Sequence, residues 1–144
     1  AAGPTVDVLA TLRLPSLAGA EDGVIFLATV DRTVPGRGTV LRHAAGELTV
    51  PPVSAAPGAT LRVRIHARDV ALAVGGPGLL SFRNRLPATV LEICGPSHDA
   101  VTIRLDAAGS LLLARITEAA VADLGLRVGS PVTALMKVVA VEGY

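Results

Sequence analysis

Ser81, Arg83 and Asn84 lie within one short stretch of the sequence and together supply groups that bind an oxyanion. The serine hydroxyl and the arginine guanidinium donate hydrogen bonds, and the asparagine side chain can donate or accept them. A tetrahedral oxyanion needs several convergent donors, which an arginine and the backbone N–H groups of a bent loop provide. The stretch 81–84 is therefore our first candidate for an anion site, although a surface salt bridge is the simpler interpretation of Arg83 alone.

Two residues far along the chain could add donors to such a site. Thr117 opens the segment Thr117–Gly125, which has an N-cap residue at its start and a glycine at its end and is therefore predicted to be a helix. The free N–H groups at the start of a helix attract anions. Lys137 is the only lysine and lies in an otherwise apolar stretch. Spacing alone leaves open that Thr117 is only a helix cap and Lys137 only a solvent-facing strand residue.

The sequence carries none of the common enzyme motifs. It has no Gly-x-x-x-x-Gly-Lys-Ser/Thr loop, no His-Glu-x-x-His and no Gly-x-Ser-x-Gly. The single cysteine, Cys94, and the three histidines, His43, His66 and His98, do not have the spacing of metal ligands. We therefore predict that the chain is not an enzyme and holds neither a metal nor a cofactor.

Composition excludes several classes of partner. With 13 basic and 12 acidic residues the net charge is +1, and only three residues are aromatic. Binding of single-stranded nucleic acid needs a basic groove and aromatic platforms, so we expect no nucleic-acid partner.

The sequence has no apolar run of about 18 residues, no signal peptide and one cysteine, so we expect no membrane insertion and a cytoplasmic location. The chain begins without Met, which favours a piece of a longer protein.

Short apolar stretches recur along the chain between Gly, Pro and Asp turns. Alternation of apolar and polar residues in Leu61–His66 and Val101–Leu105 is typical of a strand with one exposed face. Asp106–Gly109 and His43–Gly46 are predicted hairpin turns. The predicted strands are Val24–Val30, Thr39–Arg42, Glu47–Val50, Thr60–Ala67, Val70–Val74, Ala88–Ile93, Ala100–Leu105, Ser110–Ile116 and Pro131–Val141.

The two halves of the chain resemble one another. Ala28-Thr29-Val30 matches Ala88-Thr89-Val90, and the later segment 57–65 matches 128–136 after a longer interval that would hold the helix and its connector. We therefore predict a mainly β fold of two tandem OB-like small β-barrel units, the second with a short inserted helix. The first unit covers residues 1–76 and the second 77–144, with Gly75–Gly78 as the linker.

The stretch Ser81-Phe82-Arg83-Asn84-Arg85-Leu86 resembles the Ser-Ala-Arg-Asn-x-Leu/Phe signature of molybdate-binding Mop domains. Leu113–Thr117, the predicted helix, Gly129 and Ala134–Lys137 continue this pattern. The first half, including Val50-Pro51, Pro57-Gly58 and Ile65–Leu72, is similar to the region that precedes this domain in ATP-binding subunits of molybdate ABC transporters. The chain thus resembles the C-terminal regulatory region (Mop/TOBE type) of such a subunit, without its nucleotide-binding domain.

This resemblance implies a ligand, a site and partners. The ligand is molybdate or tungstate, bound between subunits by Ser81, Arg83, Asn84, Thr117 and Lys137. The function is that of a cytoplasmic regulatory domain in which ligand binding promotes dimerisation or feedback inhibition of transport. The implied partners are a second copy of the chain, the nucleotide-binding domain and the membrane permease subunits.

Two further hypotheses stay open. Phe82 stands where the signature has Ala, and Val138 follows Lys137 where a smaller residue is common. These departures favour a structural dimerisation module without a ligand. The other hypothesis is a free-standing molybdate buffer protein of the same fold, which would lack a covalently attached ATPase.

Overall fold

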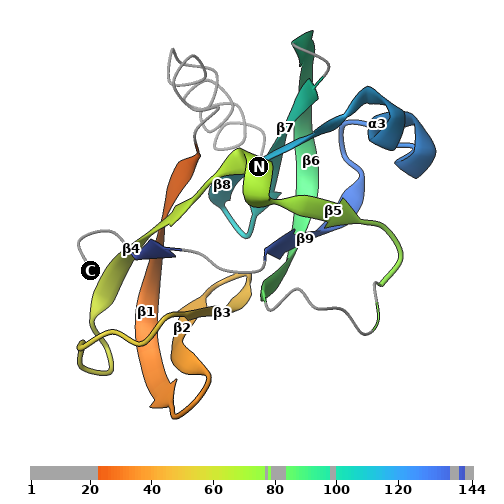
Figure 1. Ribbon diagram of the computed structural model, residues 1–144. Helices are drawn as coiled ribbons and strands as arrows, with labels where there is room; N and C mark the ends of the chain where they lie inside the picture. The colour runs from red at the N-terminus through yellow and green to blue at the C-terminus, as the bar shows by residue number, and fades with distance from the viewer. Residues whose placement is uncertain (1–22, 77, 79–83, 98–99, 137–139, 142–144) are drawn as a thin grey trace.

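Strands make up most of the computed structural model, which describes residues 23–76, 78, 84–97, 100–136 and 140–141 (Figure 1). The elements in chain order are β1 (Val24–Val34), β2 (Gly38–His43), β3 (Gly46–Val50), β4 (Thr60–Ile65), the 3-10 turn η1 (Ala67–Asp69), β5 (Ala71–Ala73), β6 (Asn84–Ser97), β7 (Ala100–Ala107), β8 (Ser110–Thr117), α3 (Glu118–Leu124), β9 (Pro131–Met136) and β10 (Ala140–Val141). The predicted mainly β fold with one short helix before its last strands is confirmed.

The strands form two antiparallel five-stranded sheets, in the orders β10-β4-β1-β2-β3 and β5-β9-β6-β7-β8. Each sheet takes four strands from one half of the chain and its fifth strand from the other half. Val141 of β10 pairs with Val63 of β4, and Leu72 of β5 pairs with Ala134 of β9. The two halves therefore exchange an edge strand, and a boundary at residue 76 stays a prediction.

The internal repeat seen in the sequence has a counterpart in the backbone. In each half, one valine exchanges two hydrogen bonds of 2.8–2.9 Å with the turn before the fourth strand: Val30 with Gly58 and Ala59, and Val90 with Gly129 and Ser130. The strand register also shifts directly after each valine, at Val30/Arg32 and at Val90/Glu92. A β-bulge at the same place in both halves is a built-in feature of the repeat.

One continuous core joins the two sheets. Alternate side chains of β1 point inward, with Phe26 and Val30 buried, and they belong to the same cluster as Leu86 of β6 and Leu105 of β7. Full burial of each such apolar side chain contributes roughly 1.5–3 kcal/mol. Apart from Phe26 the core cluster is aliphatic, as the composition predicts, and its side chains come from both sheets.

One predicted strand is wrong. The apolar stretch Pro131–Val141 is predicted as a single strand, but β9 pairs with β5 and β6 in the second sheet, whereas β10 pairs with β4 in the first. Continuous hydrophobicity does not reveal this division, because both strands bury apolar side chains. The strand predicted to begin at Ala88 begins earlier, at Asn84, so the end of the signature stretch lies in β6.

Candidate oxyanion site

Asn84 is buried at the start of β6, with 1% of its surface exposed. Its side-chain Oδ1 accepts a hydrogen bond from the Thr49 N–H at 2.7 Å, and its Nδ2 donates to the Thr49 carbonyl oxygen at 3.2 Å. Thr49 belongs to β3, the edge strand of the first sheet. An edge strand offers unpaired backbone groups, and the carboxamide of Asn84 satisfies one pair of them. This side chain therefore links the two halves of the chain and fixes the start of β6.

Thr117 is the last residue of β8 and the N-cap of α3. Its Oγ1 accepts a hydrogen bond from the Ala120 N–H at 3.1 Å, and the helix ends at Gly125, whose left-handed φ of 61° is suited to glycine. The predicted helix cap is confirmed. Because the hydroxyl accepts this bond, its hydrogen can still be donated outward from an exposed position.

The other three predicted ligands, Ser81, Arg83 and Lys137, lie outside the described residues. The nearest described positions are Asn84, which follows Arg83, and Met136, which precedes Lys137. Asn84 and Met136 are partners in the ladder between β6 and β9. The described structure therefore places the residue after Arg83 directly opposite the residue before Lys137.

Thr117 and Asn84 lie at opposite ends of the second sheet. Thr117 pairs with Ala100, and Ala100 pairs with Ser97, the last residue of β6, whereas Asn84 is the first residue of that 14-residue strand. At about 3.3 Å per residue the two ends of β6 are tens of ångströms apart along the strand. Figure 1 shows α3 beside the upper part of β6 and the start of β6 at its lower end. Within one chain, the fold does not bring Thr117 to Asn84.

His43 forms a second link between the halves, which sequence reasoning did not identify. Its ring stacks on Phe26 with centroids 4.2 Å apart, and its Nδ1 accepts a hydrogen bond from the Ala45 N–H at 2.9 Å. An accepting Nδ1 places the ring hydrogen on Nε2, which lies 2.9 Å from the Ser110 hydroxyl of β8 and donates to it. Burial lowers the pKa of His43 below its ordinary 6.5.

The described residues contain no group of three or more His, Cys, Asp or Glu side chains that could hold a metal ion. No helix in the described part of the chain is long and apolar enough to cross a membrane. The described side chains that were predicted as ligands, Asn84 and Thr117, offer an amide and a hydroxyl. The Thr117 hydroxyl can donate a hydrogen bond to an anion, whereas both polar atoms of the Asn84 amide already bond the Thr49 backbone.

Residues 80–142 match the family model of the TOBE domain. This segment of the chain is similar to a TOBE domain. It is 41% identical over 144 residues to the molybdenum import ATP-binding protein ModC of Mesorhizobium japonicum, a match covering 99% of this chain and 39% of that protein. It is 40% identical to ModC of Albidiferax ferrireducens, covering 98% of this chain and 38% of that one. The chain thus spans about two fifths of the length of these relatives.

A solved structure has the same fold. The cytoplasmic molybdate-binding protein ModG, determined with molybdate bound, superimposes with a TM-score of 0.70 and 24% identity, covering 82% of this chain and 94% of ModG. The resemblance to the regulatory region of molybdate-transporter ATP-binding subunits is confirmed by these relatives. Neither the TOBE match nor the fold shared with ModG is a catalytic one, in agreement with the prediction that this chain is not an enzyme.

Proposed function

We propose that this chain is the molybdate-binding regulatory region of a transporter ATP-binding subunit, acting in the cytoplasm beside a membrane permease. The observation that carries the proposal is its similarity, over 99% of its length, to a molybdenum import ATP-binding protein. The placement of Asn84 opposite Met136 supports it, because Arg83 directly precedes Asn84 and Lys137 directly follows Met136. Tungstate, which has nearly the same size and charge, is a second ligand in this proposal.

The proposed site lies between two copies of the chain. Ser81, Arg83, Lys137 and the main chain around Asn84 belong to one copy, and Thr117 to the other. The separation of Thr117 from Asn84 along β6 supports this arrangement. An anion that bridges two copies stabilises only the arrangement in which both sets of donors meet, so ligand binding favours one state of the dimer. Feedback inhibition of transport is the proposed consequence.

Isothermal titration calorimetry of the full chain with molybdate, tungstate and sulfate tests this function. Molybdate and tungstate are expected to bind, and Arg83→Ala is expected to abolish binding because the guanidinium supplies the strongest hydrogen bonds to the anion. Arg62→Ala is the matched control, because Arg62 is exposed on β4 in the first sheet. No heat with any of the three anions, at protein concentrations well above micromolar, would refute the ligand.

A dimerisation module without a ligand is the second candidate. It is favoured by the side chain of Asn84, whose amide is already used in two hydrogen bonds to Thr49. Sedimentation equilibrium separates the two candidates, since this module would form a dimer whose association constant is the same with and without molybdate.

A further inference from the structure

A pocket of about 460 Å³ lies where two hairpin turns meet the strands β6 and β9. The turn between β2 and β3 provides Ala44 and Ala45, and the two strands provide Pro87 and Pro131 among others. Alanine, proline and valine side chains form most of the wall. Asp106, at the end of β7, is the only charged residue among the described residues of the lining.

This pocket lies at the opposite end of β9 from the proposed molybdate site. Thr89, which lines the pocket, pairs with Pro131, the first residue of β9, whereas Asn84 pairs with Met136, the last. The two pairs are five residues apart, which at about 3.3 Å per residue is about 17 Å. The pocket is therefore a separate feature of the second sheet.

The carboxylate of Asp106 is oriented but not neutralised. Its Oδ1 accepts a hydrogen bond from the Gly109 N–H at 2.7 Å, which holds the side chain against the hairpin turn. Within the described part of the chain, Asp106 has no ion-pair partner. A carboxylate has about four acceptor sites, so Asp106 can accept further hydrogen bonds. A preoriented group lowers the cost of ordering a binding site.

The repeat provides an internal comparison for this carboxylate. The Ala-Thr-Val match makes Thr29 and Thr89 equivalent, and these residues pair with Arg42 and Asp106. Equivalent positions in the two halves therefore carry opposite charges. In the first half, Arg42 Nε lies 3.3 Å from Asp31 Oδ1, so the charge is neutralised within the chain. The second half leaves its charge beside a pocket.

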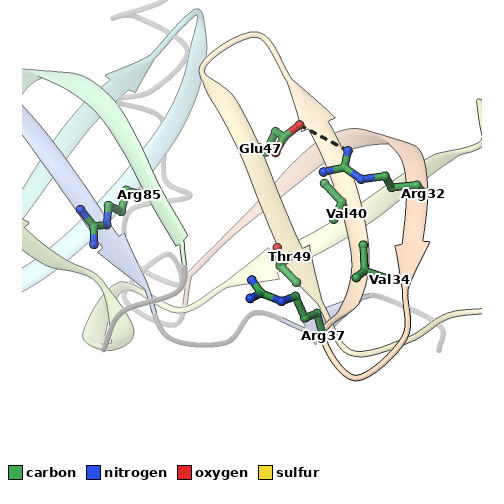
Figure 2. A pocket seen from close by; sticks show the side chains of 7 residues that line it. All are labelled: Arg32, Val34, Arg37, Val40, Glu47, Thr49 and Arg85. Atoms are coloured by element: carbon green, nitrogen blue, oxygen red, sulfur yellow. Dashed lines mark ion pairs between the residues drawn. The ribbon is translucent and has the colours of Figure 1, made fainter. Parts of the chain in front are cut away.

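A second pocket, on the first sheet, gives a further comparison. Its lining includes Glu47, whose carboxylate lies 3.7 Å from the guanidinium of Arg32, also in the lining (Figure 2). A cation that approached Glu47 would compete with Arg32. Of these two pockets, the one beside Asp106 thus has the carboxylate that is available to an added cation.

We propose that the pocket beside Asp106 binds an organic cation, a protonated amine or a guanidinium group carried on an aliphatic body. Sites for small organic molecules have volumes of roughly 300–1,000 Å³, mostly apolar walls and a few polar groups that fix orientation. This pocket has that size and that kind of lining. The apolar wall covers the aliphatic body, and Asp106 receives the charge. The cation belongs either to a free small molecule or to a basic side chain of a partner polypeptide.

Titration of the full chain with butylammonium and butylguanidinium at low salt tests this site. Binding is followed by NMR shifts of the backbone N–H groups of Ala44, Ala45 and Ala108, which line the pocket. Butanol and butyrate are the matched probes without positive charge. Butanol is expected to bind at least about threefold more weakly than the cations, and butyrate is expected not to bind.

Asp106→Asn is expected to weaken binding of both cations about three- to tenfold, because it removes the charge while its Oδ1 can still accept from the Gly109 N–H. Ala44→Leu is a second variant, which keeps the charge and is expected to weaken binding by filling the pocket from an exposed position. Asp123→Asn is the control, because Asp123 is an exposed carboxylate on α3 outside the lining.

An acetylated and amidated Ala-Arg-Ala peptide distinguishes the two sources of the cation. Tighter binding of the peptide than of butylguanidinium indicates a partner polypeptide, and equal or weaker binding indicates a free small molecule. Arg83→Ala is expected to leave cation binding intact, so this site and the molybdate site can fail separately. The proposal is overturned if neither cation shifts the lining signals, if butanol binds as tightly as the cations, or if Asp123→Asn weakens binding as much as Asp106→Asn does.

Discussion

At the scale of single residues, the fold depends on two polar side chains that cross between the halves. Asn84 pairs with the backbone of Thr49, and His43 pairs with Ser110. The sequence could mark Asn84 as part of an anion-binding stretch, but it could not reveal Thr49, because the partner of a buried amide is set by tertiary packing. The same holds for Ala45 and Asp106, which are distant in sequence and share one pocket.

Asn84→Ala is expected to lower the free energy of unfolding by about 2 kcal/mol, since two hydrogen bonds are lost and the Thr49 backbone groups lose their partners. Urea denaturation followed by circular dichroism measures this change. Arg62→Ala, an exposed control, should change the free energy by less than about 0.5 kcal/mol. A change equally small for Asn84→Ala would show that the link to β3 is not needed.

The burial of His43 predicts that the free energy of unfolding depends on pH. Because burial lowers its pKa in the folded state below the ordinary 6.5, the neutral ring contributes stability above that value, and the contribution is lost as the pH falls through the folded-state pKa. Protonation also removes the acceptor for the Ala45 N–H. Unfolding free energies measured at about pH 7.5 and about pH 5.5 should differ less for His43→Gln than for the original chain. An identical pH dependence in both would contradict this role.

At the scale of elements, the sequence predicts most strands, the helix and the hairpins. Alternation identifies strands such as β4 and β7, and the turn Asp106–Gly109 is closed as expected by a hydrogen bond from the Gly109 N–H to Asp106 Oδ1 at 2.7 Å. The exchange of β5 and β10 could not be predicted. These strands have three and two residues, which is too short for a periodic signal, and their partners are far away in the sequence.

The two roles assigned to Thr117 can be separated by substitution. Thr117→Ala should lower the free energy of unfolding by about 1 kcal/mol, because the Ala120 N–H loses its cap, whereas Thr117→Ser keeps the capping oxygen and should cost less. Thermal denaturation compares the two variants. In the proposed site Thr117→Ser also retains molybdate binding, so a loss of binding in that variant would contradict a hydroxyl role.

At the scale of the whole molecule, the exchanged strands and the common core make the two sheets mutually dependent. The core cluster contains side chains of both sheets, including Phe26 and Leu86. Sequence similarity between the halves predicts the repeat but not this dependence, because a repeat is equally compatible with two independent units.

The full chain is expected to unfold in one cooperative transition, with NMR signals from both sheets disappearing at the same urea concentration. Residues 77–144 alone are expected not to form a stable monomer, because β9 loses β5 and the shared core is opened. Two separate transitions, or a folded monomer of 77–144, would show that the halves are independent.

Binding of molybdate between two copies is the central claim, and calorimetry of mixed variants tests it most directly. Arg83→Ala and Thr117→Ala chains are titrated with molybdate separately and then as an equimolar mixture. Each variant alone should give little or no binding heat. In the mixture, a dimer of the two variants has one site with both an intact Arg83 and an intact Thr117, so binding should reappear. If the original chain binds molybdate and the mixture stays silent, the two residues do not meet between chains and the account is wrong.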